Sequence, residues 1–256
     1  MKKVFICGCG WVGKALRDEL EDIYELTCLV KTQKSLDTLE TTDKFLFSQE
    51  ILESQQFYNA DSIVIAIPPR GLYLESLRMI PLSLSSKTQV ILLSSTSVYP
   101  QVRGVVEEED TKKIINPTLM LEGERLVQKR YANVLILRLG GLMGYNRVAG
   151  KYTSGKIKDY DAPVNYIHRD DVINIIKLCI EKEVKSQVFN VVAPNHPRQS
   201  EIYTKNSEAF NWESTKFNSL ELKGKMVSSS KLIKFLSYTF LKENPLYFWK
   251  DTNSVS

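Results

Sequence analysis

The feature that most constrains this chain is a glycine pattern, GxGxxG, that directly follows an apolar run near the N-terminus. The run at residues 4–7 predicts a buried strand, and Gly8, Gly10 and Gly13 come straight after it. Apolar residues at helical spacing continue as far as Leu20, which predicts an amphipathic helix. A strand, a glycine turn and a helix in this order form the fingerprint of a dinucleotide-binding site.

Each glycine has a physical role in such a site. Gly8 allows the tight turn, Gly10 lets the backbone approach a pyrophosphate, and Gly13 lets the helix pack closely on the strand. The diphosphate would lie at the N-terminal end of the helix, where backbone N–H groups and the helix dipole attract anions. The cofactor contacts predicted in this segment are Gly8, Gly10, Trp11, Val12 and Gly13.

Composition limits the class of protein. With 256 residues, 43% hydrophobic and 25% charged, the chain can bury one substantial core and carry a small additional lobe. The net charge of +4 is small, and basic residues are interleaved with acidic ones, which is not typical of a nucleic-acid-binding protein. No stretch reaches the ~20 apolar residues of a membrane span, and glycines break the N-terminal run too early for a signal peptide.

The four cysteines, Cys7, Cys9, Cys28 and Cys179, lie in apolar stretches. Their spacing matches neither a metal site nor an obvious disulfide framework. We therefore expect no metal ion, thiols buried as small apolar side chains, and a reducing, cytoplasmic location.

Strands and helices alternate along most of the chain. Near-continuous apolar runs predict buried strands, separated by helical segments, at 24–30, 61–67, 89–93 and 133–139. This order predicts an α/β fold, a Rossmann-type doubly wound parallel sheet over residues 1–193 with a substrate-facing loop at about 140–165. The shorter, more polar and aromatic elements of residues 194–256 predict a small C-terminal α+β substrate lobe packed on it.

The end of the second strand bears on which dinucleotide would bind. An NAD site usually carries Asp or Glu there, which accepts a hydrogen bond from the ribose 2′-hydroxyl. Here the segment contains Lys31 and Lys34 instead. A cation attracts a 2′-phosphate, so NADP is favoured over NAD; the alternative is that both lysines are solvated loop charges.

Several later segments carry a family resemblance. Polar residues follow the strand at 89–93, at the end where ligands bind in open α/β sheets. Together with the glycine motif GCGWVG at 8–13, the chain contains AIPP at 66–69, SSTSVYP at 94–100, NYIHRDDV at 165–172 and FNV at 189–191. In this order they resemble the short-chain dehydrogenases/reductases in their extended and atypical branches, often called NAD-dependent epimerases/dehydratases, and in particular a compact bacterial subgroup.

The resemblance implies roles for residues of these segments. Further cofactor contacts would come from Ala66, Ile67, Pro68 and Ser94. The hydroxyl of Ser95 would hold the oxygen of the reacting substrate, provided that the local backbone does not consume it.

The chain departs from the family at its acid/base pair. Family enzymes use a Tyr, and a Lys four residues later that lowers the pKa of the Tyr. Matching the helix of the family to residues 117–125 puts Asn116 and Met120 at these positions, and neither can do that work. Tyr99 and His168 are the substitutes that the sequence offers. The alternatives are that Tyr99 forms an aromatic wall and that His168 is architectural, as in the family.

Two arginines are candidates for holding an anionic group of the substrate. Arg138 and Arg147 lie in or after the strand that precedes the substrate-facing loop in related enzymes. Arg138 could equally be a buried ion-pair partner.

These features predict an NAD(P)-dependent oxidoreductase or epimerase that acts on a small polar carbonyl or hydroxyl metabolite. The alternatives are a non-catalytic NAD(P)-binding sensor and a nucleotide-sugar epimerase or dehydratase, although the region after Val192 is short for a sugar-nucleotide lobe. We expect a monomer or homodimer with no nucleic-acid or membrane partner.

Overall fold

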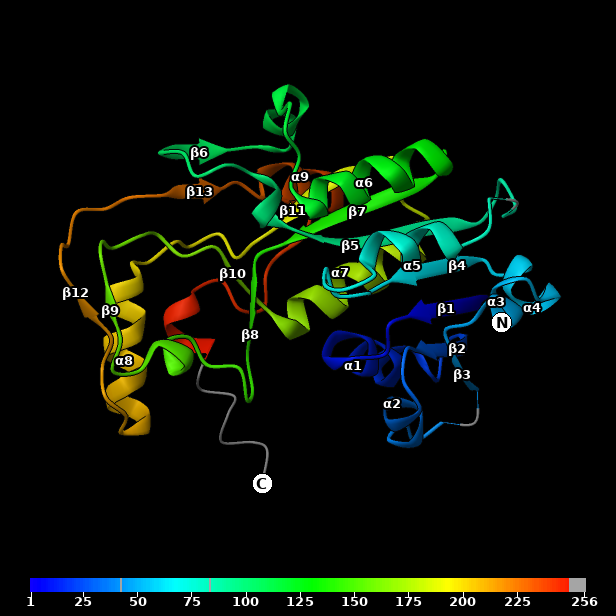
Figure 1. Cartoon of the computed structure of the whole chain (residues 1–256), viewed down its shortest axis with the longest axis horizontal. Helices are drawn as coiled ribbons and strands as arrows, with labels where there is room; N and C mark the ends of the chain where they lie inside the picture. Colours follow the sequence, from blue (N-terminus) through cyan, green and yellow to red (C-terminus); the bar gives the residue numbers. More distant parts are fainter. Residues whose placement is uncertain (42, 83, 249–256) are drawn as a thin grey trace. The chain divides into compact units, whose positions relative to one another are not determined.

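The computed structural model describes residues 1–41, 43–82 and 84–248. Its main element is a seven-stranded sheet with the strand order β11-β7-β5-β4-β1-β2-β3 (Figure 1). The strands are β1 Lys3–Cys7, β2 Glu25–Val30, β3 Lys44–Leu46, β4 Ser62–Ile65, β5 Gln89–Ser95, β7 Val134–Leu139 and β11 Val188–Val191. Strand β1 pairs in parallel with both β2 and β4, and the order reverses at this point. The predicted Rossmann-type sheet is confirmed.

Helices follow most of these strands. They are α1 Trp11–Leu20, α2 Gln33–Asp37, α3 Gln49–Leu52, α4 Gln55–Tyr58, α5 Tyr73–Met79, α6 Leu119–Arg130 and α7 Arg169–Glu181. Helix α5 packs against α6 so closely that a Cβ on Gly123 would lie 2.6 Å from the ring of Tyr73. None of the described helices is long and apolar enough to span a lipid bilayer.

The strands are apolar because parallel strands are buried on both faces. Every residue of β4 and β7 is buried. A polar exception is Gln89 of β5, which is 2% exposed. Its amide donates to the carbonyls of Cys179 and Val184 at 2.8 and 2.7 Å and accepts from the Ser62 hydroxyl at 2.9 Å. Gln89 therefore joins the sheet to the end of α7.

The chain divides into two compact units. The first comprises residues 1–94, 115–137 and 173–188, and the second comprises 95–114, 138–172 and the segment from 189 onwards. This division differs from the predicted boundary between residues 193 and 194. Residues 95–114 and 138–172, which follow strands of the sheet, belong to the same unit as the C-terminal part.

Short parallel strand pairs explain this division. The second unit contains the strands β6 Gly104–Val106, β8 Gly141–Met143, β9 Ile157–Lys158, β10 Tyr166–His168, β12 Lys216–Phe217 and β13 Lys225–Val227. Strand β6 pairs with β13, β9 with β12 and β8 with β10 (Figure 1). The remaining elements of this unit are α8 Gln199–Phe210, α9 Ser230–Leu236 and the 3-10 helices η1 Thr96–Val98, η2 Glu108–Lys113 and η3 Lys151–Thr153. Backbone pairing over long sequence separations thus joins the loops to the C-terminal segment.

We expect Gln89→Leu to lower the free energy of unfolding by about 2–4 kcal/mol, because the Ser62 hydroxyl and two buried carbonyls would lose their partner. Urea denaturation of the variant and the wild type measures the difference. The control is Gln128→Leu, at an exposed position on α6. Equal effects of the two substitutions would contradict the role assigned to Gln89.

Candidate functional site

The glycine loop between β1 and α1 is held against two neighbouring strands. Gly8 has a φ of +110°, and its N–H donates to the Leu29 carbonyl of β2 at 2.8 Å, as does that of Cys9 at 3.2 Å. A Cβ on Gly8 would lie 2.6 Å from the carbonyl oxygen of Ala66. Both the positive φ and this close approach require glycine.

The other two glycines have different surroundings. A Cβ on Gly13 would lie 2.5 Å from the Gly8 carbonyl oxygen, so Gly13 is required for packing α1 onto the loop. A Cβ on Gly10 would meet no described atom within 4 Å. Packing among the described residues therefore does not require a glycine at position 10. The missing side chain leaves open space at the start of α1.

The N-terminus of α1 differs from those of α2, α4 and α6. Helices α2, α4 and α6 begin with a Thr or Ser whose hydroxyl accepts from a backbone N–H of the first turn. Gly10, which precedes α1, has no side chain for this purpose, and the first turn contains no acidic residue. N–H groups of a first helical turn have no partners within the helix and attract anions. The segment thus fits the diphosphate of a dinucleotide.

A cavity of about 280 Å³ lies at this loop. Its lining includes predicted cofactor contacts, namely Gly8, Gly10, Lys31, Ala66, Ile67 and Pro68. The other lining residues are Cys9, Leu29, Val30, Thr32, Ser35, Phe47, Arg70 and Ser76. The C-terminal ends of β1, β2 and β4 therefore meet at one cavity, as expected for this fold.

Other predicted contacts are placed differently. Trp11, Val12, Gly13 and Ser94 are not among the residues that line this cavity. Val12 and Gly13 are buried on α1, and Ser94 is buried and donates to Glu124 at 2.5 Å. The Ser94 hydroxyl is thus committed to a side chain of α6.

The charge of the cavity lining is positive. Lys31 and Arg70 line it, and both are exposed. No Asp or Glu is among the described residues of the lining. The hydroxyls of Thr32 and Ser35, 2.9 Å apart, lie at the same end of β2. Sequence reasoning found Lys31 but missed Arg70, because nothing in a residue that follows two prolines predicts a turn back to this cavity.

Ser95, the predicted holder of the substrate oxygen, ends β5 and begins the second unit. Its hydroxyl oxygen accepts from the Ser97 N–H at 3.1 Å. Among the described residues the hydroxyl proton is donated to no acceptor. The local turn therefore uses the oxygen of Ser95 and leaves its proton available for another acceptor.

Tyr99 and Arg138 form a buried network in the second unit. Tyr99 is 2% exposed, and its hydroxyl donates to the Asn190 side chain at 2.6 Å and accepts from Arg138 at 2.9 Å. Arg138, 3% exposed, also donates to the Glu108 carbonyl at 2.9 Å and to the Thr111 hydroxyl at 2.8 Å. These bonds hold η2 and β11 around the guanidinium.

This arrangement does not suit the predicted roles of the two residues. Burial raises the pKa of Tyr99 to about 12, although the guanidinium of Arg138 opposes the shift. Donor and acceptor functions of the hydroxyl are both engaged. The alternative that Arg138 is a structural, buried cation describes its surroundings better than the prediction of substrate binding.

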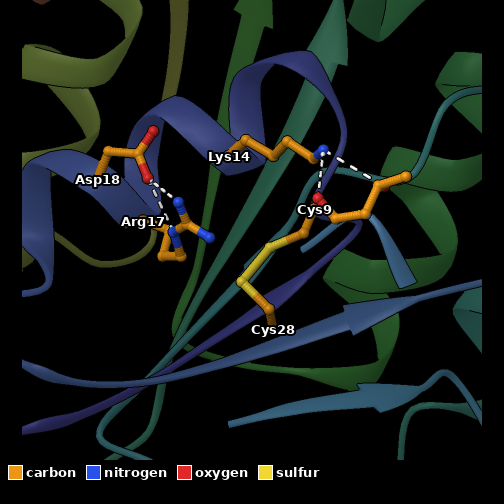
Figure 2. The surroundings of a disulfide bond; sticks show 6 residues. Cys9, Lys14, Arg17, Asp18 and Cys28 are labelled. Carbon is orange, nitrogen blue, oxygen red and sulfur yellow. Dashed lines mark hydrogen bonds and ion pairs between the residues drawn. A yellow bond between two sulfur atoms is a disulfide. The ribbon is translucent and has the colours of Figure 1, made fainter. Parts of the chain in front are cut away.

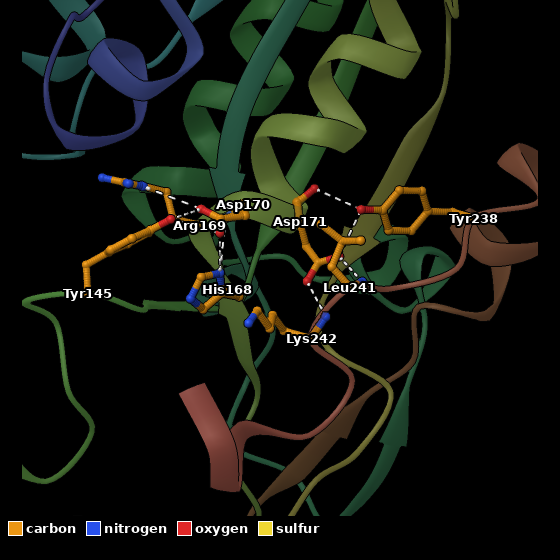
Figure 3. Close-up of polar contacts among 8 residues, drawn as sticks. All are labelled: Tyr145, His168, Arg169, Asp170, Asp171, Tyr238, Leu241 and Lys242. Carbon is orange, nitrogen blue, oxygen red and sulfur yellow. Dashed lines mark hydrogen bonds and ion pairs between the residues drawn. The ribbon is translucent and has the colours of Figure 1, made fainter. Parts of the chain in front are cut away.

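Arg147 and His168 are part of one structured region (Figure 3 shows the surroundings of His168). Arg147 is half-buried, and its backbone pairs with Gly144. A Cβ on Gly144 would lie 2.3 Å from His168 Nε2. His168 is fully buried, and its Nδ1 accepts from the Asp170 N–H at 3.2 Å. The packing favours the architectural interpretation of His168.

Asp171 fastens the C-terminal segment, as Figure 3 shows. It is fully buried and accepts from the Tyr238 hydroxyl and the Leu241 N–H at 2.8 Å, and from the Lys242 N–H at 3.0 Å. Burial raises the pKa of this carboxyl, although the donors favour its charged form. The NYIHRDDV segment thus supplies tertiary anchors.

The second unit contains a cavity of its own of about 480 Å³. Three lysines, Lys158, Lys223 and Lys225, line it, together with the single acidic residue Asp159. The side-chain oxygen of Gln199, which also lines it, is buried and has no hydrogen-bond partner among the described residues. Such a lining suits an anion that also carries a hydroxyl group.

Of these lysines, Lys225 is held most firmly. It is 9% exposed, and its ammonium donates to the carbonyls of Tyr99 and Pro100 at 2.8 and 3.3 Å. Burial lowers its pKa. The substrate-facing loop predicted at about 140–165 includes Lys158, whereas Lys223 and Lys225 lie outside it, and only strand pairing brings them to the same cavity.

The structure also corrects the interpretation of the cysteines. Cys9 and Cys28 form a disulfide with a Cα–Cα distance of 5.8 Å, whereas Cys7 and Cys179 are free and buried (Figure 2). The expectation that all four cysteines are buried thiols was wrong for this pair, because the two residues are 19 positions apart and only the pairing of β2 beside the glycine loop makes them neighbours.

Comparison with known proteins places the chain in a family. No protein-family model matches the sequence. The chain is 30% identical to protein YeeZ of Escherichia coli strain K12 over 269 aligned positions, which cover 96% of this chain and 98% of YeeZ. The chain belongs to the YeeZ family.

Solved structures share its fold. A protein of Methylobacillus flagellatus assigned to the NAD-dependent epimerases/dehydratases has a TM-score of 0.80 at 20% identity, covering 99% of this chain and 98% of that chain. Human SDR39U1, solved with NADPH, has a TM-score of 0.74 at 13% identity over 100% of both chains. UDP-glucuronic acid 4-epimerase from Bacillus cereus, solved with NAD, has a TM-score of 0.71 at 18% identity over 98% of both. These likenesses show that the chain shares the fold of these proteins.

Tyr99→Phe is expected to lower the free energy of unfolding by about 1–3 kcal/mol, because the Asn190 side chain and Arg138 lose a buried partner. Thermal and urea denaturation measure the loss, with the exposed Tyr152→Phe as the control. A fully stable Tyr99→Phe protein that binds cofactor normally but has lost turnover would instead support the acid/base role.

Proposed function

We propose that the chain is an NAD(P)-dependent oxidoreductase or epimerase of the atypical short-chain dehydrogenase/reductase kind, acting on a small polar carbonyl or hydroxyl metabolite. The observation that carries this proposal is the open backbone at Gly10 before a helix N-terminus without a side-chain cap or acidic residue. Two structural neighbours, solved with NADPH and with NAD, support a nicotinamide dinucleotide as the ligand.

NADP is proposed as the preferred form. Lys31 and Arg70 bring positive charge to the cavity, and its described lining contains no carboxylate that could accept from a ribose 2′-hydroxyl. The hydroxyls of Thr32 and Ser35 hydrogen-bond to each other at 2.9 Å, which leaves one of their two protons for a phosphate oxygen at the same end of β2. A 2′-phosphate would gain charge-assisted hydrogen bonds here, whereas a free hydroxyl would not.

The chemistry that such a cofactor supplies when bound is hydride transfer. Ser95 would donate its hydroxyl proton to the substrate oxygen, since its own oxygen already accepts from the Ser97 N–H. Tyr99 is engaged by Arg138 and Asn190, so proton transfer is assigned to water or to the substrate itself. Ser95 therefore orients and polarises the substrate in this proposal, without acting as a base.

The substrate is proposed to carry an anionic group. The cavity of the second unit is lined by Lys158, Lys223 and Lys225, and Gln199 adds a side-chain acceptor. This replaces the earlier assignment of the anion to Arg138, whose guanidinium is buried in a network of its own. A small carboxylate or phosphate ester with a hydroxyl group fits this lining.

A non-catalytic dinucleotide sensor is the second candidate. The lack of the acid/base pair of the family favours this candidate. Asn116, which is exposed, and Met120, which is 5% exposed, occupy the positions of the Tyr and the Lys. In a sensor the dinucleotide would bind with the same determinants, and no carbonyl substrate would be turned over.

For the cofactor, we expect Lys31→Ala to weaken NADPH binding by about tenfold and to leave NADH binding unchanged, since only NADPH carries the 2′-phosphate. Isothermal titration calorimetry with both nucleotides measures this. Lys34→Ala, an exposed lysine on α2 outside the cavity lining, is the control. Binding of neither nucleotide by the wild type would refute the dinucleotide site.

For the reaction, Ser95→Ala is expected to lower kcat/KM by at least about 100-fold while NADPH affinity stays the same. The assay follows NADPH oxidation with a panel of small aldehydes, ketones and anionic sugars. Ser97→Ala, at an exposed position whose backbone N–H remains, is the matched control. NADPH binding by the wild type without turnover across the panel would favour the sensor.

A further inference from the structure

The Cys9–Cys28 disulfide lies within the candidate dinucleotide site itself. Cys9 is between Gly8 and Gly10 of the loop, and Cys28 precedes Leu29, whose carbonyl holds that loop. We propose that this cysteine pair is a redox modification site at which a dithiol reductant weakens dinucleotide binding. The inference rests on the proposed function, because it concerns the same cavity.

The first argument is how the loop is attached to β2. The N–H groups of Gly8 and Cys9 share a single acceptor, the Leu29 carbonyl, at 2.8 and 3.2 Å. The disulfide adds a covalent tie one residue away on the same strand (Figure 2). Reduction breaks the covalent tie. Of these contacts between the loop and β2, only the two hydrogen bonds to the Leu29 carbonyl then remain.

This attachment matters because the loop presents the bare backbone of Gly10. Gly10 donates to the Gly8 carbonyl at 2.8 Å and accepts from the Lys14 N–H at 2.8 Å, so its position follows that of Gly8. A loop that is ordered before binding loses less conformational entropy when the ligand binds. The oxidised protein should therefore bind a dinucleotide more tightly than the reduced protein.

The second argument is access. Cys9 is only 3% exposed, but it lines the dinucleotide cavity, whereas Cys28 is 1% exposed and is absent from that lining. A reductant would reach the sulfur of Cys9 through the cavity that the ligand occupies. Bound dinucleotide should therefore slow the reduction as well as oppose it.

The chemistry is thiol–disulfide exchange. A thiolate of the dithiol attacks Cys9 Sγ, the Cys9–Cys28 bond breaks, and Cys28 leaves as a thiolate that takes up a proton. The second thiol of the reductant then displaces Cys9, which is protonated in turn, and the reductant is left as a disulfide. Two electrons pass to the protein. Cys9 also lies just before α1, where the positive end of the helix favours a thiolate.

The other two cysteines provide an internal contrast. Burial raises the pKa of both Cys7 and Cys179 to about 12, so their thiols stay protonated near neutral pH. Neither is in the cavity lining. Reactivity toward thiol reagents should therefore be confined to the Cys9–Cys28 pair.

The test compares NADPH titrations of the wild-type protein before and after incubation with dithiothreitol. Thiol counts on denatured samples confirm each state: two free thiols before reduction and four after it. We expect the reduced protein to bind NADPH about three- to tenfold more weakly. Because linkage is reciprocal, saturating NADPH should shift the dithiol–disulfide equilibrium toward the disulfide by the same factor.

Variants separate the site from general effects of the reductant. Cys9→Ser should bind NADPH as weakly as the reduced wild type and should not respond to dithiothreitol. Cys179→Ala should respond as the wild type does. Equal or tighter binding by the reduced wild type would overturn this inference alone. Absence of NADPH and NADH binding in both states, with thiol counts still two and four, would instead overturn the proposed function.

Discussion

The close approach of the glycine loop to β2, β4 and α1 is the constraint on which the candidate dinucleotide site depends. The Leu29 carbonyl receives the loop, the Ala66 carbonyl fills the place where a Cβ of Gly8 would be, and Gly13 brings α1 onto Gly8. Strand ends and a helix N-terminus therefore meet at one point. Gly10 is the exception, since no described atom lies within 4 Å of the place where its Cβ would be.

Buried polar networks have the corresponding role in the second unit. Arg138 organises Tyr99, Glu108 and Thr111, while Asp171 holds the C-terminal segment. In the interior such networks are stabilising only when their members are satisfied. Residue types that often perform catalysis therefore have an architectural role here. Residue type alone suggested acid/base and anion-binding roles for them, because the sequence does not show which partners they have.

The functional proposal rests on polar and charged groups that lie outside these buried networks. The proton of Ser95 and the cations Lys31 and Arg70 are not consumed in the same way, and Lys158 lines the second cavity beside Lys223 and Lys225. In the proposed function, Lys31 and Arg70 would bind the hydride donor, Ser95 would polarise an oxygen and the lysines would hold an anion. The Cys9–Cys28 pair would add to this a dependence of cofactor affinity on thiol reductants.

Local sequence patterns determined much of the fold and part of the site. The apolar runs specified the parallel strands, and the glycine spacing specified the loop, because strand burial and turn geometry depend on neighbouring residues. Lys31 was likewise found from its place at a strand end, and the AIPP segment from the family resemblance. Only the tertiary structure decided which polar groups are already engaged. Tyr99 meets Arg138 over 39 positions and Cys9 meets Cys28 over 19, and these encounters depend on strand order and register, which no local pattern encodes.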